Sequence, residues 1–356
     1  MEYKLKTITY VTTVDELVYP FSMQAIGDVF THCLKNSVEV AKLKNEHTNR
    51  KSKVQLAKVK TDQPTRIPQL PVNEKKVFNN ANWNQKNLLM LNGNLLPNCT
   101  AKNTHYIKVL QTFRHSSENA MLAALTSSGI IELYRYYFGS HQLFKLPVDL
   151  TALRQIHKIQ LGDKKNITDF ATLVKAYDDV TFGNFEWCPV NFDDFKLLVV
   201  TTKADELIIY RIQDEIALQE YSSEINGLGR NELKWTYSEE GGHNLFIGTD
   251  DGNLKQFQIN LLSDGKVQGV VEVDDIKGKL DVPITHVLVY YHQDVTLLLC
   301  CKTHTLEIFQ ISKDKAACII SKYIGISITG IDDSGELEFL LTTLNSNIYM
   351  LKLILN

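Results

Sequence analysis

The sequence predicts an all-β fold assembled from repeated antiparallel units, and three observations lead to this prediction. A pair of short apolar strands joined by a polar turn recurs six times along the 356 residues. A strand-like run precedes most of these pairs and another follows most of them, which gives four strands per unit. The last four pairs begin roughly 40–50 residues apart, a repeat length typical of four-stranded propeller blades. We therefore expect one WD40-like β-propeller domain over residues 1–356, with six detectable blades.

The six strand pairs are predicted to be hairpins, because most of their turns contain Gly, Asn, Ser or Asp, which adopt the conformations that tight turns require. They begin at Val29, Met121, Leu197, Leu245, Leu297 and Phe339. Longer intervals between the first three pairs predict insertions. The last unit ends after its third strand, and the alternating segment 3–11 (YKLKTITYV) can supply the missing outermost strand.

The remaining strands are expected in apolar runs on either side of the hairpins. The runs predicted to form first strands are PFSM, IKVLQTF, NFEWC, ELKWTY and THVLVYY, and those predicted to form fourth strands are HQLFKLPV, ALQEY, VQGVVEV and ACIISKY. Trp187 and Trp235 occupy equivalent positions in two first strands, so we expect them to pack between blades rather than to stack on a ligand. A blade with two apolar faces is unstable alone, and its neighbours must therefore stack on it.

A short amphipathic helix is predicted at about residues 166–180, inserted between two blades. Its apolar side chains follow the spacing i, i+3, i+4, i+7 of one helical face: Phe170, Leu173, Val174 and Tyr177. Thr168 or Asp169 can cap its first turn.

A basic segment at about residues 42–76 is predicted to be a flexible loop. It is polar, and several prolines follow its basic part, a composition that does not favour a packed core. Seven basic side chains are candidate contacts to nucleic acid or to a partner: Lys42, Lys44, Arg50, Lys51, Lys53, Lys58 and Lys60. Clustered positive charge of this kind binds phosphate backbones, but it is also typical of a solvated linker or a nuclear-import signal.

Composition limits the class of protein. The chain has 38 Lys and Arg against 41 Asp and Glu, a net charge of −3, which argues against a wholly basic nucleic-acid-binding protein. No apolar run is long enough to cross a bilayer, and the first ten residues lack the apolar core of a signal peptide. The six cysteines are scattered, so we expect reduced thiols rather than a disulfide framework.

The sequence offers no coherent catalytic, cofactor or metal site. Cys300, Cys301 and His304 are close in sequence, but adjacent strand residues point to opposite faces and a zinc site needs four ligands. The Gly-x-Gly at residues 227–229 precedes a strand, so it lacks the helix N-terminus that binds phosphate. No motif combines a nucleophile, a base and an orienting group. We therefore expect a protein that is not an enzyme and has no cofactor.

The order of several segments resembles the N-terminal propeller of the delta (90-kilodalton) subunit of the general transcription factor TFIIIC. The similarity is best over four segments: NAMLAALTSSGIIELY (119–134), PVDLTAL (147–153), NITDFATLVKAY (166–177) and NFEWC (184–188). Weaker similarity covers LKWTYSEEGGHNLFIGTDDG (233–252) and DVPITHVLVYYHQ (281–293). No single motif is diagnostic, and the ordered series with its inserted helix carries the resemblance.

The resemblance implies a nuclear, non-enzymatic scaffold subunit in RNA polymerase III initiation. Its expected partners are other TFIIIC subunits, TFIIIB and RNA polymerase III, with DNA reached through the complex or through the basic segment. No membrane and no small-molecule substrate is implied. The family's propeller is expected to have seven blades where six are detectable here, and the family's zinc-binding region does not match any part of this sequence.

Two alternatives stay open at this point. The first is an acetyl-CoA-dependent histone acetyltransferase, an activity ascribed to some members of the family, although no matching site is present in the sequence. The second is a propeller adaptor in an unrelated complex, which would share the fold and not the partners.

Overall fold

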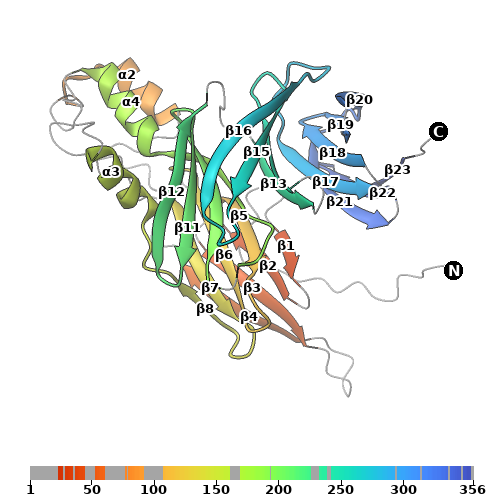
Figure 1. The fold of residues 1–356 in the computed structure, drawn as a ribbon, viewed down its shortest axis with the longest axis horizontal. Helices are drawn as coiled ribbons and strands as arrows, with labels where there is room; N and C mark the ends of the chain where they lie inside the picture. Colours follow the sequence, from red (N-terminus) through yellow and green to blue (C-terminus); the bar gives the residue numbers. More distant parts are fainter. Residues whose placement is uncertain are drawn as a thin grey trace. The chain divides into compact units, whose positions relative to one another are not determined.

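The computed structural model consists of short antiparallel strands with few helices (Figure 1). The residues that it describes are 23–26, 29–34, 37–44, 53–60, 77, 79–91, 107–160, 169–192, 194–225, 232–238, 242–292, 295–312, 315–335, 337–345 and 348–353. They form six antiparallel sheets, which follow one another along the sequence as blades of a WD40-like β-propeller. The predicted fold class is therefore confirmed. A seventh blade, which the resemblance implies, is not found among the described residues.

The blades belong to two compact units, and the first unit contains two blades. The first blade consists of β1 (Met23–Ile26), β2 (Val29–Leu34), β3 (Ser37–Lys44) and β4 (Lys53–Lys60). The second consists of β5 (Ile107–Arg114), β6 (Asn119–Thr126), β7 (Ile131–Tyr137) and β8 (Gln142–Lys145). Apolar side chains from both blades form one core, in which Val38, Leu122 and Tyr134 are fully buried.

The second unit contains the other four blades and the helices. Its first two blades are β9 (Phe182–Trp187), β10 (Lys196–Thr202), β11 (Glu206–Gln213) and β12 (Ile216–Glu224), then β13 (Leu233–Ser238), β14 (Gly242–Gly248), β15 (Leu254–Leu261) and β16 (Val267–Ile276). The next two are β17 (His286–His292), β18 (Val295–Lys302), β19 (Thr305–Ser312) and β20 (Lys315–Tyr323), then β21 (Ile328–Gly335), β22 (Glu338–Thr343) and β23 (Ile348–Lys352). The first strands of consecutive blades in this unit lie next to each other.

All six predicted hairpins form, as β2–β3, β6–β7, β10–β11, β14–β15, β18–β19 and β22–β23. The predicted first strands appear as β5, β9, β13 and β17, and the predicted fourth strands as β8, β12, β16 and β20. In the first blade, β1 begins at Met23, later than the PFSM run suggests. The last blade ends after its third strand, and the segment 3–11 expected to complete it lies outside the described residues.

The prediction of a flexible loop at about residues 42–76 is wrong for two segments. Residues 42–44 belong to β3 and residues 53–60 form β4, the fourth strand of the first blade. The high charge of β4 concealed its period of two, which places Ala57 and Val59 opposite Val40 and Val38 in the core of the first unit. Residues 45–52 and 61–76 lie outside the described residues.

Neighbouring blades of the second unit bury their apolar faces against each other. One core joins the blades β9–β12 and β13–β16, with Leu197 and Ile209 from the first and Trp235 and Leu245 from the second. Each of these side chains is at most 2% exposed, and full burial of such a side chain contributes about 1.5–3 kcal/mol. Trp187 and Trp235 are both buried, as the packing role predicted for them requires.

A helix is found at the predicted insertion, and a second helix precedes it. Helix α4 (Phe170–Val180) begins with a capping box: Asp169 accepts from the Thr172 N–H, and the Thr172 hydroxyl accepts from the Asp169 N–H. Leu173 and Tyr177 form its buried face. Helices α3 (Leu150–Gln160) and α2 (Trp83–Leu91) were not predicted. Within the described part of the chain, no helix has the length and apolar character needed to cross a bilayer.

Helix α3 turns a polar face toward its blade. Arg154 is fully buried and donates to the Glu206 carboxylate at the start of β11. Lys158, one helical turn later, lies 3.2 Å from the same carboxylate, while Ile156 on the other side of the helix is 52% exposed. The apolar side chains of this helix therefore do not mark its buried face, so their spacing could not have predicted how the helix packs.

A buried ion pair fixes the connection between β16 and β17. Lys302 and Glu307 are both completely buried, with 2.7 Å between Nζ and Oε2. The Lys302 ammonium also donates to the Leu280 carbonyl at 2.7 Å, and the Glu307 carboxylate accepts from the Lys279 N–H. Because each charged group has further hydrogen-bond partners, the pair holds this connection against the blade that follows it.

Candidate functional site

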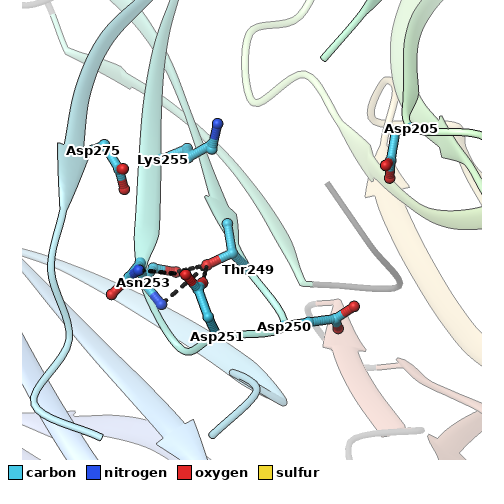
Figure 2. A pocket seen from close by; sticks show the side chains of 7 residues that line it. All are labelled: Asp205, Thr249, Asp250, Asp251, Asn253, Lys255 and Asp275. Atoms are coloured by element: carbon cyan, nitrogen blue, oxygen red, sulfur yellow. Dashed lines mark hydrogen bonds between the residues drawn. The ribbon is translucent and has the colours of Figure 1, made fainter. Parts of the chain in front are cut away.

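A pocket lies in the second unit where the turns of two neighbouring blades meet (Figure 2). Its volume is about 310 Å³. Asp205 comes from the β10–β11 turn, the stretch from Thr249 to Asn253 forms the β14–β15 turn, and Lys255 and Asp275 lie on β15 and β16. The lining residues are Asp205, Thr249, Asp250, Asp251, Asn253, Lys255 and Asp275.

The β14–β15 turn is tight, and glycine is required within it. Gly252 has a φ of +78°, and a Cβ atom at this position would lie 2.3 Å from the Leu280 carbonyl oxygen. Across the base of the turn, the Thr249 N–H donates to the Asn253 carbonyl at 2.9 Å. Any side chain larger than hydrogen at position 252 would therefore displace the β16–β17 connection.

Asp251 is held inside this turn by hydrogen bonds. The Thr249 hydroxyl donates to its carboxylate, and the Asn253 amide donates to Oδ2 at 2.7 Å (Figure 2). The Thr249 hydrogen bond is the main cause that lowers the pKa of Asp251 below 3.8. The Asn253 side chain also accepts from the Gly278 N–H at 2.9 Å, so one residue joins this wall of the pocket to the β16–β17 connection.

The pocket carries an excess of negative charge. Four aspartates line it against one lysine, Lys255, whose ammonium lies 3.5 Å from Glu272 on β16. Asp275 pairs with Lys277 at 2.9 Å, and Asp251 is engaged within its turn. Asp250 is exposed at the tip of the turn and points away from the Thr249–Asn253 hydrogen bonds (Figure 2). A site of this charge favours a cationic group over an anionic one.

The seven basic residues predicted to contact nucleic acid or a partner do not line this pocket. Lys42 and Lys44 lie on β3, while Lys53, Lys58 and Lys60 lie on β4, where Lys44 is paired in register with Lys53. The Lys58 ammonium lies 2.7 Å from Glu39, whose carboxylate also bonds to His32 at 2.9 Å. Arg50 and Lys51 lie outside the described residues, and the role of the set stays a prediction.

The cysteines weighed as metal ligands are buried in strand β18. Cys300 belongs to the apolar core that the blades β13–β16 and β17–β20 share, and Cys301 is its neighbour along the strand. Burial raises the pKa of both thiols, and it raises the pKa of Cys188 to about 12. Within the described ranges, no three His, Cys, Asp or Glu side chains are grouped so that they could hold a metal ion.

Sequence reasoning recognised part of the pocket without assigning it a role. The residues 250–252 (DDG) lie in the turn of the hairpin predicted to begin at Leu245, and Asp251 uses its carboxylate inside this turn. The sequence TDDGN contains the signal for this network, because Thr, Asp and Asn side chains commonly bond to nearby turn backbone. Asp205 and Asp275 are distant from this turn in the sequence, so no local sequence signal links them to the pocket.

Comparisons with known proteins establish the fold alone. No family model matches the chain, and no curated protein matches it. The β-propeller domain of Cps50 (Swd1) from Myceliophteria thermophila is 12% identical, with a TM-score of 0.50, over 92% of this chain and 81% of that one. This likeness supports a WD40-like propeller.

Two further solved structures are similar with lower scores. A functionally unknown protein from Desulfotomaculum acetoxidans is 10% identical, with a TM-score of 0.48, over 94% of this chain and 85% of that one. BBS1N, in a complex with ARL6DN, is 9% identical, with a TM-score of 0.44, over 93% of this chain and 76% of that one.

Replacing Thr249 with valine should raise the pKa of Asp251 toward its usual value and make stability less dependent on pH. Because the folded pKa of Asp251 lies below its unfolded value, its contribution is present at neutral pH and is lost as the pH falls through the folded pKa. Urea unfolding of Thr249→Val and of the unmodified chain, from pH 7 down to about pH 2, measures this. The stability difference should shrink in acid.

Thr236→Val is the matched control for this measurement. The Thr236 hydroxyl donates to the Asn244 carbonyl at 3.3 Å, so its removal should cost the same free energy at every pH. A stability difference for Thr249→Val that stays constant down to about pH 2 would show that the hydroxyl does not stabilise the charged carboxylate.

Proposed function

We propose that this chain is a non-enzymatic scaffold subunit of the TFIIIC complex in RNA polymerase III initiation. In this role it bridges other TFIIIC subunits and helps to recruit TFIIIB and the polymerase. It acts in the nucleus and reaches DNA mainly through the complex. The observation that carries the proposal is the ordered series of segments that resembles the delta subunit family.

The order of elements in the fold is compatible with that series. The segment 119–134 spans the β6–β7 hairpin, and PVDLTAL leads into α3. NITDFATLVKAY contains the capped start of α4, and NFEWC contains the end of β9. A pair of helices between two blades is a feature that a simple propeller repeat does not require, so its place in the series adds weight to the resemblance.

A scaffold role also suits the fold itself. Propeller blades form a rigid framework, and the turns at the blade ends are free to contact other proteins. The acidic pocket between the β10–β11 and β14–β15 turns offers such a contact, because its wall is fixed through Asn253 and the β16–β17 connection. We assign to it a lysine or arginine side chain of a neighbouring subunit.

Affinity purification of the tagged full chain from its own cells tests the proposal. TFIIIC subunits should be recovered, with TFIIIB and RNA polymerase III in smaller amounts. The double variant Asp205→Asn, Asp250→Asn should reduce recovery of one partner by about tenfold, because removing charge from a complementary interface weakens it. Partners from another complex, with no TFIIIC or TFIIIB subunit, would contradict the proposal.

The double variant Asp214→Asn, Asp264→Asn is the control for this experiment. It removes the same charge from the turns at the opposite ends of the same two blades, after β11 and β15. Asp205 and Asp214 both have a left-handed backbone conformation, with φ of 58° and 49°, so each double variant changes one residue in this conformation. An equal reduction in partner recovery for both variants would show that the pocket does not bind that partner.

The basic residues near β4 are tested separately by DNA binding of the full chain. The triple variant Arg50→Gln, Lys51→Gln, Lys53→Gln should weaken binding and reduce the salt slope by about 0.9 for each phosphate that is no longer neutralised. The control variant Lys277→Gln, Lys322→Gln, Lys352→Gln removes the same charge from exposed positions elsewhere. If both triple variants bind DNA equally at low salt, the segment is a linker or an import signal.

A further inference from the structure

The connection between β16 and β17 (residues 277–285) packs against the β14–β15 turn, which forms one wall of the acidic pocket. A Cβ atom on Gly252 would lie 2.3 Å from the Leu280 carbonyl oxygen and 2.5 Å from the Val282 carbonyl oxygen. A Cβ atom on Gly278 would lie 2.2 Å from the Gly252 carbonyl oxygen. The turn and the connection therefore form one continuous part of the second unit.

This connection exposes two apolar side chains beside the pocket. Leu280 is 39% and Val282 is 36% exposed, and Asp281 between them is exposed as well. A single exposed apolar side chain is common on protein surfaces and needs no explanation. Two of them on one short connection, next to a charged pocket, give the combination of apolar contact and polar surroundings that is typical of protein interfaces.

Hydrogen bonds from buried charges hold the backbone that carries these side chains. The Lys302 ammonium donates to the Leu280 carbonyl at 2.7 Å, and the Glu307 carboxylate accepts from the Lys279 N–H at 3.2 Å. Burying two charges costs free energy, and these hydrogen bonds to the connection help to offset that cost. Leu280 is therefore attached to a backbone that is already ordered, which reduces the entropy lost when a partner binds.

The charges beside these side chains determine which partner the surface favours. Asp250, at the tip of the turn, and Asp281, on the connection, are both exposed. The lysines at the start of the connection have partners of their own: Lys277 lies 2.9 Å from Asp275, and the Lys279 ammonium donates to a carbonyl of β20 at 3.4 Å. The surface is therefore complementary to a partner that carries positive charge next to an apolar side chain.

We propose that Leu280 and Val282 form the apolar half of a partner-binding surface whose acidic half is the pocket. The occupant is one segment of a partner protein, in which a Lys or Arg side chain enters the pocket and a neighbouring apolar side chain packs on Leu280 and Val282. This inference rests on the proposed binding of a cationic side chain in the pocket. Burial of the apolar side chains provides affinity, while the charges select the partner.

Photo-crosslinking of the tagged full chain in its own cells tests this inference. Benzoylphenylalanine at Val282 should crosslink to one partner peptide. That peptide should contain a Lys or Arg within about four residues of the attachment point, because an extended chain advances about 3.4 Å per residue. Benzoylphenylalanine at Leu262, which is 42% exposed and follows β15 at the other end of its blade, should not crosslink to this peptide.

The identity of the peptide separates this inference from the proposed function. A peptide of the expected composition from a TFIIIC subunit supports both. A peptide of that composition from another complex supports the surface and contradicts the role in TFIIIC. A peptide that lacks Lys and Arg near the attachment point, or no crosslink from Val282, would overturn the inference.

Partner recovery with substituted chains provides the second measurement. The variant Leu280→Ser, Val282→Ser should reduce recovery of the crosslinked partner about tenfold, and the variant Asp205→Asn, Asp250→Asn should reduce recovery of the same partner. The control variant Ile216→Ser, Leu262→Ser removes exposed apolar side chains from the opposite ends of the two blades and should leave recovery unchanged. Equal recovery with both serine variants, or loss of different partners by the serine and asparagine variants, would overturn the inference.

Discussion

The structure depends on one constraint: each central blade of the second unit is apolar on both faces and must be covered on both. In the blade β13–β16, Trp235 and Leu245 face the core shared with β9–β12, while Phe246 and Leu254 face the core shared with β17–β20. Because successive strand residues point to opposite faces, neither set can be buried within one sheet. Stability therefore comes from the packing between blades, and the turns at their ends are left free for other uses.

Polar interactions fix the positions of a connection and a turn at the ends of these blades. The buried pair of Lys302 and Glu307 anchors the β16–β17 connection, and Asn253 joins that connection to the β14–β15 turn. Removing one member of such a pair is costly, since it leaves a buried charge unpaired. These interactions hold the turn that carries Asp250 and Asp251 in one arrangement. One wall of the acidic pocket is accordingly fixed by hydrogen bonds within the second unit.

The hairpins could be predicted from sequence because two local signals coincide, the alternation of apolar residues and the turn residues between the strands. Strand β4 was missed because four of its eight residues are Lys or Gln, although its alternate residues pack on β3. Helix α3 buries Thr151 and Arg154, so its apolar side chains do not mark the face that packs on the blade. The pocket was missed since Asp205, Asp250 and Asp275 come together only through packing of two blades.

Hydrogen exchange in an Ile209→Ala variant tests most directly whether neighbouring blades stabilise each other. Ile209 lies on β11 in the core shared with β13–β16, and truncating a buried isoleucine costs about 2–5 kcal/mol. If the blades depend on each other, exchange should become faster in β14 and β15 as well as in β10 and β11. Faster exchange confined to β9–β12 would contradict this account and would show that each sheet is stable by itself.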